Sequence, residues 1–420
     1  MRFDNGLVDT ATAPRSDSAQ GDSRISVCLL ISSLEFGGAE RQVVELVRSF
    51  DRSRVLPFAC SLSGKVPLAA CLPNRAEDLC IVQKYSRFDL TTVPRVAKIL
   101  RERRVDVVHA FLLDAEIVAR LAAPLARVPV VIASERNADY TRPMIHRLAL
   151  RLTEPLFDVM VANSHAGKAF NIRTLGLSDS RIEVVPNGVD TGRFRPDDTA
   201  GLALRQELGI ASAASVVGMV GSFKPQKGHA NFLRVAAKLR ASVPDISFII
   251  VGEPFRDDSK ASHDYKAKMV ELARTLQLDD RCLFLGRRTD MKAVYNACDV
   301  TVLLSHLEGT PNAVLESMAC GVPVVVSDIA DNRMIVANGI NGYVVPPADV
   351  EDGANRVQTL LCNSEKQAAF GLAARESAMQ DFSFAAATTR LEDIYRSCLR
   401  RKAASNCSLP GERRNSIVIP

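Results

Sequence analysis

The segment Glu308-Gly-Thr-Pro-Asn-Ala-Val-Leu-Glu316 contains two glutamates separated by seven residues. The run 312–320 predicts a helix, because its apolar residues recur at spacings that give one buried face. Glu308 is then expected in the loop before this helix, and Glu316 about two turns into it. Backbone N–H groups at such a helix start are available to an anion. The two carboxylates and the helix start therefore suit a ligand that carries both hydroxyls and phosphates, such as a nucleotide sugar.

Apolar, β-branched segments alternate with amphipathic segments along the chain, which indicates parallel α/β sheets. In the first half, strands are expected at 25–31, 56–62, 105–110, 128–133, 159–162 and 182–185. In the second half, they are expected at 216–221, 248–251, 282–285, 300–304, 322–326 and 343–345. Two such series predict an α/β protein with two doubly wound Rossmann-like domains that face each other across a cleft.

Domain boundaries follow from shifts in composition. We expect an N-terminal domain at 24–190 and a C-terminal domain at 191–383, joined at the turn-forming segment Pro186-Asn-Gly-Val-Asp190. A last helix is predicted at 384–401, and a loose polar tail at 403–420. Residues 1–23 are polar and contain no apolar stretch typical of a secretion signal, so we expect a disordered arm.

Composition excludes several classes of protein. The chain has 420 residues, 47% of them hydrophobic, which is enough for two cores. A net charge of +5 is too small at this length to indicate a nucleic-acid partner. No apolar run approaches the ~18–20 residues of a membrane-spanning helix. The ten cysteines include no C-x2-C pair, which indicates reduced core residues in a cytoplasmic protein.

The Glu308–Glu316 segment resembles the E-x7-E signature of retaining glycosyltransferases with the GT-B fold, in particular glycosyltransferase family 4 (glycosyltransferase group 1). The segment Gly37-Gly-Ala-Glu-Arg41, after the first strand, is similar to the family's Gly-Gly-Ala-Glu-Arg loop. The resemblance extends over roughly 24–399. It implies the GT-B fold, a UDP- or GDP-linked sugar as donor, and a helix at 384–401 that returns to the N-terminal domain.

The resemblance implies donor-binding residues in both domains. Gly37 and Gly38 remove side chains where a backbone approaches a phosphate or sugar, although two glycines also suit a plain tight turn. Family members carry an Arg just after a glycine and a Lys five residues later, both of which bind the donor diphosphate. Here Lys227 occupies the Lys position, but Ser222 occupies the Arg position. Lys224 is close enough in sequence to supply the missing positive charge.

By the same resemblance, Glu316 accepts hydrogen bonds from the ribose hydroxyls, and Glu308 holds hydroxyls of the donor sugar. The segment between them supplies further donor-binding residues, namely Gly309, Thr310, Pro311 and Asn312. Arg287 follows the strand at 282–285, where it either edges the nucleobase or is a surface charge.

Two N-terminal residues are candidates for the acceptor site or the reaction centre. His109 lies near the carboxyl end of a predicted strand, where it either faces the cleft or is a hydrogen-bonded core histidine. Arg136 lies in the loop after the next strand, where it suits an anionic acceptor or a phosphate.

The implied reaction transfers a hexose to a glycan or lipid-linked acceptor, with retention at the anomeric carbon, in cell-surface polysaccharide or glycolipid synthesis. Lys227 and the helix amides would stabilise negative charge on the leaving diphosphate. No Asp-x-Asp element stands where metal-dependent transferases have one, so we expect no required metal and no cofactor. Asp257–Asp258 and Asp279–Asp280 are predicted to face solvent. Alternatives are a non-catalytic nucleotide-sugar-binding module, or another GT-B enzyme such as a nucleotide-sugar epimerase or a phosphorylase.

Residues 95–104 form a predicted helix with five basic residues and one acidic residue. Many family members work at the cytoplasmic leaflet, and a basic N-terminal-domain face is their usual docking surface. Each basic residue near an anionic surface contributes ~1 kcal/mol, so this cluster would hold the protein there reversibly. The alternative is an ordinary solvated helix face.

Overall fold

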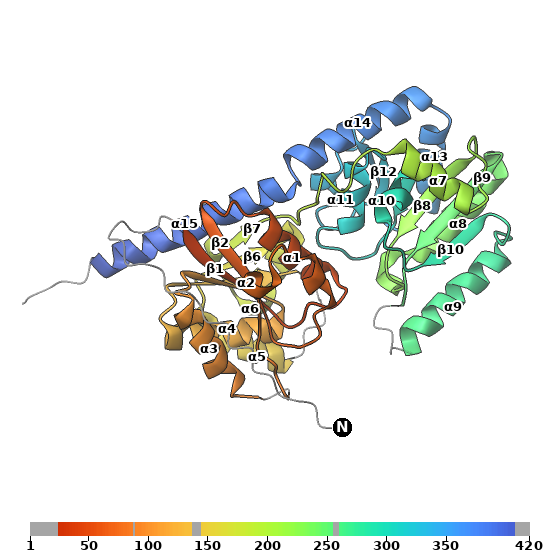
Figure 1. Ribbon diagram of the computed structural model, residues 1–420. Helices are drawn as coiled ribbons and strands as arrows, with labels where there is room; N and C mark the ends of the chain where they lie inside the picture. Colours follow the sequence, from red (N-terminus) through yellow and green to blue (C-terminus); the bar gives the residue numbers. More distant parts are fainter. Residues whose placement is uncertain (1–23, 87–88, 137–143, 255–259, 408–420) are drawn as a thin grey trace, which may run out of the picture.

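The computed structural model describes residues 24–86, 89–136, 144–254 and 260–407. Two parallel sheets, each flanked by helices, form two domains (Figure 1). The N-terminal sheet has the order β3-β2-β1-β4-β5-β6-β7, and the C-terminal sheet has the order β10-β9-β8-β11-β12-β13. In both sheets the order reverses beside the first strand, as in doubly wound folds. The prediction of two Rossmann-like domains is confirmed.

The strands of the N-terminal sheet are β1 (Ile25–Ile31), β2 (Val55–Ser61), β3 (Leu79–Ile81), β4 (Val107–Phe111), β5 (Val130–Glu135), β6 (Val159–Ala162) and β7 (Ile182–Val184). Those of the C-terminal sheet are β8 (Ser215–Val220), β9 (Ile246–Val251), β10 (Cys282–Gly286), β11 (Val300–Leu303), β12 (Val324–Ser327) and β13 (Gly342–Val345). Every predicted strand overlaps one of these. Only β3 was not predicted, because it is a short edge strand without a buried residue.

Helices cover both faces of each sheet. Those that follow the N-terminal strands are α1 (Gly38–Ser49), α2 (Arg75–Asp78), α3 (Thr92–Glu102), α4 (Leu113–Ala126), α5 (Met144–Leu152) and α6 (His165–Leu175). Those of the second half are α7 (Asp198–Glu207), α8 (His229–Ser242), α9 (Lys260–Thr275), α10 (Met291–Asn296), α11 (Asn312–Ala319), α12 (Asn332–Ile335), α13 (Val350–Leu361), α14 (Ser364–Gln380) and α15 (Phe384–Cys407). All seven residues of β1 are buried, which is expected of a parallel strand covered by helices on both faces.

Helix α15 returns from the C-terminal domain and packs against α1 and β5 (Figure 1). The hydroxyl of Tyr395 lies 2.7 Å from His109 Nδ1, and Arg54 pairs with Glu392 at 2.8 Å. Because α15 continues to Cys407, the predicted loose tail at 403–420 is wrong for 403–407. Residues 408–420 and the predicted arm at 1–23 lie outside the described residues.

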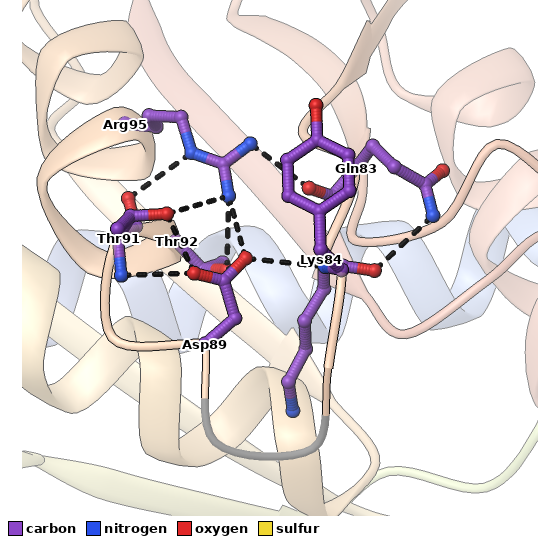
Figure 2. A network of polar contacts seen from close by, with 7 residues as sticks. Gln83, Lys84, Asp89, Thr91, Thr92 and Arg95 are labelled. Atoms are coloured by element: carbon purple, nitrogen blue, oxygen red, sulfur yellow. Dashed lines mark hydrogen bonds and ion pairs between the residues drawn. The ribbon is translucent and has the colours of Figure 1, made fainter.

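Asp89 organises the loop that leads into α3 (Figure 2). Its carboxylate accepts hydrogen bonds from the backbone N–H and the hydroxyl of Thr91, at 3.0 and 2.5 Å. Arg95 Nη2 lies 2.8 Å from the same carboxylate, and Arg95 Nη1 donates to the Gln83 carbonyl at 2.9 Å. The first basic residue of the 95–104 cluster is therefore bound within the protein.

The cysteines are more varied than their sequence contexts indicated. Most of the described cysteines are buried, but Cys71 and Cys362 are exposed and Cys80 is half-buried, so the prediction of core positions is wrong for these three. In the described ranges, no helix is both long enough and apolar enough to cross a bilayer.

Candidate active site

Helix α11 begins at Asn312, directly after the loop that holds Glu308. Glu308 and Glu316 are each only 8% exposed. Glu316 follows Asn312 by four residues, which is just over one turn, so the predicted depth of two turns is too large. Pro311 occupies the N-cap position, where a proline side chain cannot accept a capping hydrogen bond. The start of α11 thus lies between two buried carboxylates.

Lys227 binds Glu308 directly. Its Nζ lies 2.7 Å from Glu308 Oε1 and 2.9 Å from Oε2, and the Ser305 hydroxyl donates to Oε1 at 2.7 Å. The lysine side chain is 20% exposed, so the pair is largely shielded from water. A charge-assisted contact of this geometry fixes both side chains at the carboxyl edge of the C-terminal sheet.

Backbone contacts explain why two residues 81 positions apart meet here. Lys227 ends the 3-10 turn η4 (Pro225–Lys227), and Gly228 follows with φ of +73°. A Cβ at Gly228 would lie 1.9 Å from the Leu304 carbonyl oxygen, so only glycine permits this approach. The His306 N–H donates to the Gln226 carbonyl at 2.7 Å, which joins η4 to the loop before α11.

Glu316 has a partner from each domain. The Tyr295 hydroxyl donates to Glu316 Oε2 at 2.7 Å, and Arg41 Nη1 lies 3.6 Å from Oε1. Burial raises the pKa of Glu316 above its ordinary value, while Arg41 and Tyr295 act in the opposite direction. Arg41 ends the Gly-Gly-Ala-Glu-Arg segment and lies in the first turn of α1, so this helix start reaches the second glutamate across the domain interface.

Asn187 connects Arg136 to the start of α11. Its Oδ1 accepts from Arg136 Nη1 at 2.9 Å, and its Nδ2 donates to Asn312 Oδ1 at 2.8 Å and to the Thr310 carbonyl at 3.1 Å. Burial lowers the pKa of Arg136 to about 10, so its guanidinium remains positive at neutral pH. The sequence indicated only a turn at Asn187; its role between the domains depends on residues more than a hundred positions away.

The glycines of both predicted loops lie at the same interface. A Cβ at Gly38 would lie 3.5 Å from Asn312 Nδ2, and a Cβ at Gly309 would lie 2.7 Å from Asn163 Oδ1. The Thr310 hydroxyl donates to the Asn163 carbonyl. Gly37 precedes α1 as its N-cap residue. Gly38 therefore faces Asn312 at contact distance, and Gly309 and Thr310 face Asn163.

His109 lies inside the N-terminal domain, at the middle of the five-residue strand β4, so its predicted position near the carboxyl end of the strand is wrong. It is fully buried, accepts or donates a hydrogen bond at Tyr395, and packs 4.4 Å from the Phe111 ring. Burial and the nearby Arg136 charge lower the pKa of His109 well below its ordinary value, so its imidazole is neutral. Its geometry matches the core-histidine alternative.

The remaining predicted donor residues belong to the C-terminal domain. Ser222 and Lys224 are half-buried and lie between β8 and η4. Arg287 is exposed, and its guanidinium lies 5.6 Å from the ring centroid of Phe36, in the loop before Gly37. Arg288 instead pairs with acidic residues of its own domain.

One interdomain contact had no signal in the sequence. The Asp331 carboxylate accepts from the backbone N–H of His165 at 2.6 Å and from that of Ala166 at 3.1 Å. His165 Nδ1 also lies 2.9 Å from Asp331 Oδ2. A carboxylate of the C-terminal domain thus caps α6 of the N-terminal domain, where the helix dipole favours negative charge.

A cavity of about 20 Å³ lies between the domains. It is lined by Arg41, Gln42, Glu45, Gly188, Val189, Asp190, Arg193, Phe194, Asn312, Glu316 and Phe384. This volume holds about one water molecule, so a nucleotide sugar could enter here only if the domains moved apart. Lys227 and Glu308 are not part of this lining.

Acidic residues elsewhere are dispersed. Within the described ranges, no three His, Cys, Asp or Glu side chains gather closely enough to hold a metal ion. Asp279 and Asp280 are exposed, as predicted, whereas Asp257 and Asp258 lie outside the described residues.

Comparison with known families identifies both halves of the chain. Residues 36–193 match the family described as Glycosyltransferase Family 4, and residues 202–377 match the Glycosyl transferases group 1 family. The chain belongs to glycosyltransferase family 4. The first match includes the Gly37–Arg41 loop, and the second includes Lys227, Glu308 and Glu316.

Related proteins of this family have been given different transferase names. A UDP-Gal:alpha-D-GlcNAc-diphosphoundecaprenol alpha-1,3-galactosyltransferase from Escherichia coli is 29% identical over 64% of this chain and 69% of its own length. A D-inositol 3-phosphate glycosyltransferase from Saccharomonospora viridis is 29% identical, and the match spans 67% of this chain but only 66% of that protein. The protein of the same name from Nocardia farcinica is 29% identical over 94% of this chain and 89% of its own length.

Solved structures share the fold. Anabaena Alr3699/HepE, crystallised with UDP, superposes with a TM-score of 0.77 at 22% identity, over 89% of this chain and all of that one. Sucrose-phosphate synthase from Thermosynechococcus elongatus superposes with a TM-score of 0.70 at 18% identity, over 90% of this chain. These likenesses confirm the predicted GT-B architecture.

Proposed function

We propose that this protein is a retaining glycosyltransferase that moves a hexose from a UDP- or GDP-linked sugar to a glycan or lipid-linked acceptor. The observation that carries the proposal is the convergence of Lys227, Glu308 and Glu316 around the start of α11. This arrangement offers a cation, helix amides and two buried carboxylates, which match the phosphates and hydroxyls of a nucleotide sugar. The E. coli relative is named for a UDP-linked donor, which supports the same donor class here.

Each side chain has a role in this proposal. Lys227, together with the amides at the start of α11, stabilises the charge that develops on the departing diphosphate. Glu308 binds hydroxyls of the transferred sugar, and Glu316 accepts hydrogen bonds from the ribose. A donor diphosphate would take over part of the Lys227 ammonium, which frees one Glu308 oxygen for the sugar. Because Lys227 and these amides already stabilise the negative charge of the diphosphate, no metal ion is needed, and we propose metal-independent transfer.

The acceptor would enter from the N-terminal domain. Gly38 faces Asn312 across the interface, and Arg136 is linked to Asn312 through Asn187. The E. coli relative is named for a diphosphate-linked lipid and the S. viridis relative for an inositol phosphate, so both names describe an anionic acceptor. Arg136 and Arg41 are the N-terminal cations suited to such a charge. We propose that the reaction takes place in the cytoplasm, at its boundary with a membrane.

The test uses purified protein, a panel of nucleotide sugars, and an acceptor extract, with mass-spectrometric detection of products. A transferase releases the nucleoside diphosphate only in the presence of acceptor. Anomeric configuration is then determined by NMR coupling constants, and a chelator is added in a parallel reaction. An inverted product would overturn the retaining mechanism, and loss of turnover with chelator would overturn metal independence.

The same assay separates the alternatives. A binding module releases no nucleotide under any condition. An epimerase converts the donor without acceptor, and a phosphorylase requires inorganic phosphate. Any of these outcomes would contradict the proposed transfer.

A further inference from the structure

The loop 221–224 connects β8 to η4 and carries two of the predicted donor-binding residues, Ser222 and Lys224. One side of the loop is held by its backbone. The N–H groups of Gly221 and Phe223 donate to carbonyls at the end of β9 and just after it, at 2.9 Å in both cases. The loop therefore follows the end of β9, and its position depends equally on what packs against its other side.

His229, the first residue of α8, lies on that other side. Its side chain is fully buried, and its ring stacks on Phe223 with the ring centroids 4.4 Å apart and the planes inclined by 19°. The Tyr265 ring of α9 meets it edge-on, with the centroids 5.8 Å apart. Helix α9 itself packs against α8 (Figure 1). His229 is thus enclosed between the loop and α9.

The ring nitrogens of His229 are poorly matched to this enclosure. Within the described residues, neither nitrogen makes a hydrogen bond of good geometry. Burial lowers the pKa of His229 to about 4, so the imidazole is neutral at neutral pH. The backbone carbonyls of Gly221 and Lys224, at the two ends of the loop, act in the opposite direction because they face the ring. A neutral imidazole has a single N–H, so it can donate to only one of these two carbonyls.

Packing alone does not explain a histidine at this position. A buried polar atom without a good hydrogen bond lowers stability, and an apolar ring of the same shape avoids that loss. A phenylalanine ring could occupy the same place against Phe223. A single N–H that faces two carbonyls instead suits a loop whose backbone changes its arrangement when a ligand binds.

We propose that His229 is a positioning residue, whose N–H binds a carbonyl of the loop 221–224 when the donor diphosphate is present and so fixes Ser222 and Lys224 against the phosphates. The inference rests on the proposed function, because it assigns a further part of the same donor site. His229 acts through the loop and touches no substrate, since its own ring is fully buried. Groups fixed in this way stabilise charge on a leaving group without having to reorient during the reaction.

Two substitutions separate hydrogen bonding from packing. His229→Phe keeps a ring and removes the N–H, whereas His229→Gln keeps an N–H donor and removes the ring. We expect His229→Phe to bind UDP and GDP about three- to tenfold more weakly than wild type, with an equal or higher melting temperature. His229→Gln should melt at a lower temperature but retain more of the diphosphate affinity. A residue needed only for packing would give the opposite order of affinities, and that result would overturn the proposal.

Nucleosides show whether the effect reaches the phosphates. Uridine and guanosine lack the diphosphate, so His229→Phe should bind them like wild type in an NMR titration. Equal losses for nucleosides and nucleoside diphosphates would overturn the proposal. The matched control is Tyr265→Phe, which removes only a hydroxyl from the other ring that contacts His229. This control should bind UDP and GDP like wild type.

The ring nitrogens can also be observed in the wild-type protein, which makes the test independent of whether a variant folds. The chain has six histidines, and His229 can be assigned through its contact with Phe223. With histidine isotope-labelled at the ring nitrogens, UDP or GDP should shift the His229 signals, and uridine or guanosine should not. Unchanged signals in protein saturated with the diphosphate would overturn the proposal.

The outcomes distinguish this inference from the proposed function. A wild-type protein that binds neither UDP nor GDP would overturn the donor site as a whole, and the role of His229 with it. A wild-type protein that binds one of them, with the same affinity in His229→Phe, would overturn only the role of His229.

Discussion

The Tyr295 hydroxyl donates a 2.7 Å hydrogen bond to Glu316 Oε2 inside the C-terminal domain. Both side chains are buried, so this bond fixes the carboxylate in one orientation before any ligand arrives. The second oxygen, Oε1, points to the interface, where the 39%-exposed Arg41 side chain approaches it. An exposed partner of this kind is readily exchanged for a ligand hydroxyl, whereas the buried tyrosine is retained.

Glu316→Ala should therefore weaken nucleoside diphosphate binding by about 10- to 150-fold, since a charged acceptor for buried hydroxyls is worth ~1.5–3 kcal/mol. Tyr295→Phe should weaken it less. Isothermal titration calorimetry with the ribose nucleotide measures both, and the 2′,3′-dideoxy nucleotide is the control, whose affinity should not change. Equal losses for the two nucleotides would show that Glu316 does not bind the ribose.

Stability should depend on pH through Glu316. Burial raises its pKa above the ordinary 4.5, so the folded state binds the proton more tightly than the unfolded state. The favourable contribution is then fully present below pH 4.5 and is lost as pH rises through the folded pKa. Urea unfolding between about pH 4 and pH 7 should show wild type losing free energy of unfolding relative to Glu316→Gln as pH rises. A constant difference between the two proteins would contradict this assignment.

Lys227→Met should lower kcat by about 10²-fold or more, because it removes the charge that the leaving diphosphate needs most. It also leaves Glu308 without its cation, which lowers stability. The double variant Lys227→Met/Glu308→Gln should recover stability but not turnover. Lys238→Met, which breaks an exposed pair with Glu351, is the control and should leave turnover unchanged. Wild-type kcat in Lys227→Met would exclude it as the phosphate ligand.

The Ser222 position tests the departure from the family pattern. Ser222→Arg should be tolerated, because Ser222 is only half-buried, and it should raise donor affinity if it restores the usual cation. Lys224→Met should lower donor affinity in wild type but much less in the Ser222→Arg background. Additive effects in this double-mutant cycle would show that Lys224 does not replace the missing arginine.

Gly188→Ala should destabilise the fold by about 1–3 kcal/mol, since an added methyl overpacks a filled site. A Cβ at Gly188 would lie 2.5 Å from Phe384 Cδ1, at the start of α15, and Gln42 binds both the N–H and the carbonyl of Gly188. Thermal and urea unfolding measure the change. Phe384→Ala is itself destabilising, but it removes the ring that the added methyl group would meet. Gly188→Ala should therefore lower the free energy of unfolding much less in the Phe384→Ala protein than in wild type. An equal loss in both proteins would show that the methyl group does not clash with Phe384.

The sequence predicted the elements better than their contacts. Buried parallel strands are continuous apolar runs, so β1 and β12 could be located from composition alone. The spacing of apolar residues in the run 312–320 located α11 in the same way. A family resemblance then supplied the roles of Glu308 and Glu316. Neither the apolar pattern nor the family resemblance indicated which residues bind those two glutamates within the protein.

Contacts between distant residues required the structure. Tyr295 lies in a short helix that the sequence analysis did not single out, and Asn187 lies in a segment that was predicted only to form a turn. The predicted candidate His109 lies at the middle of β4, where Tyr395 of α15 binds it, and that docking could not be predicted from the strand.

The Asp331 cap on α6 has a consequence for measurement. The amide hydrogens of His165 and Ala166 are bonded to a carboxylate that belongs to the other domain. They would lose their acceptor each time the domains separate, and only then exchange readily with solvent deuterium. Hydrogen–deuterium exchange of these two amides, measured in a peptide from the start of α6, would therefore report how often the two domains separate. The measurement needs no label attached to the enzyme.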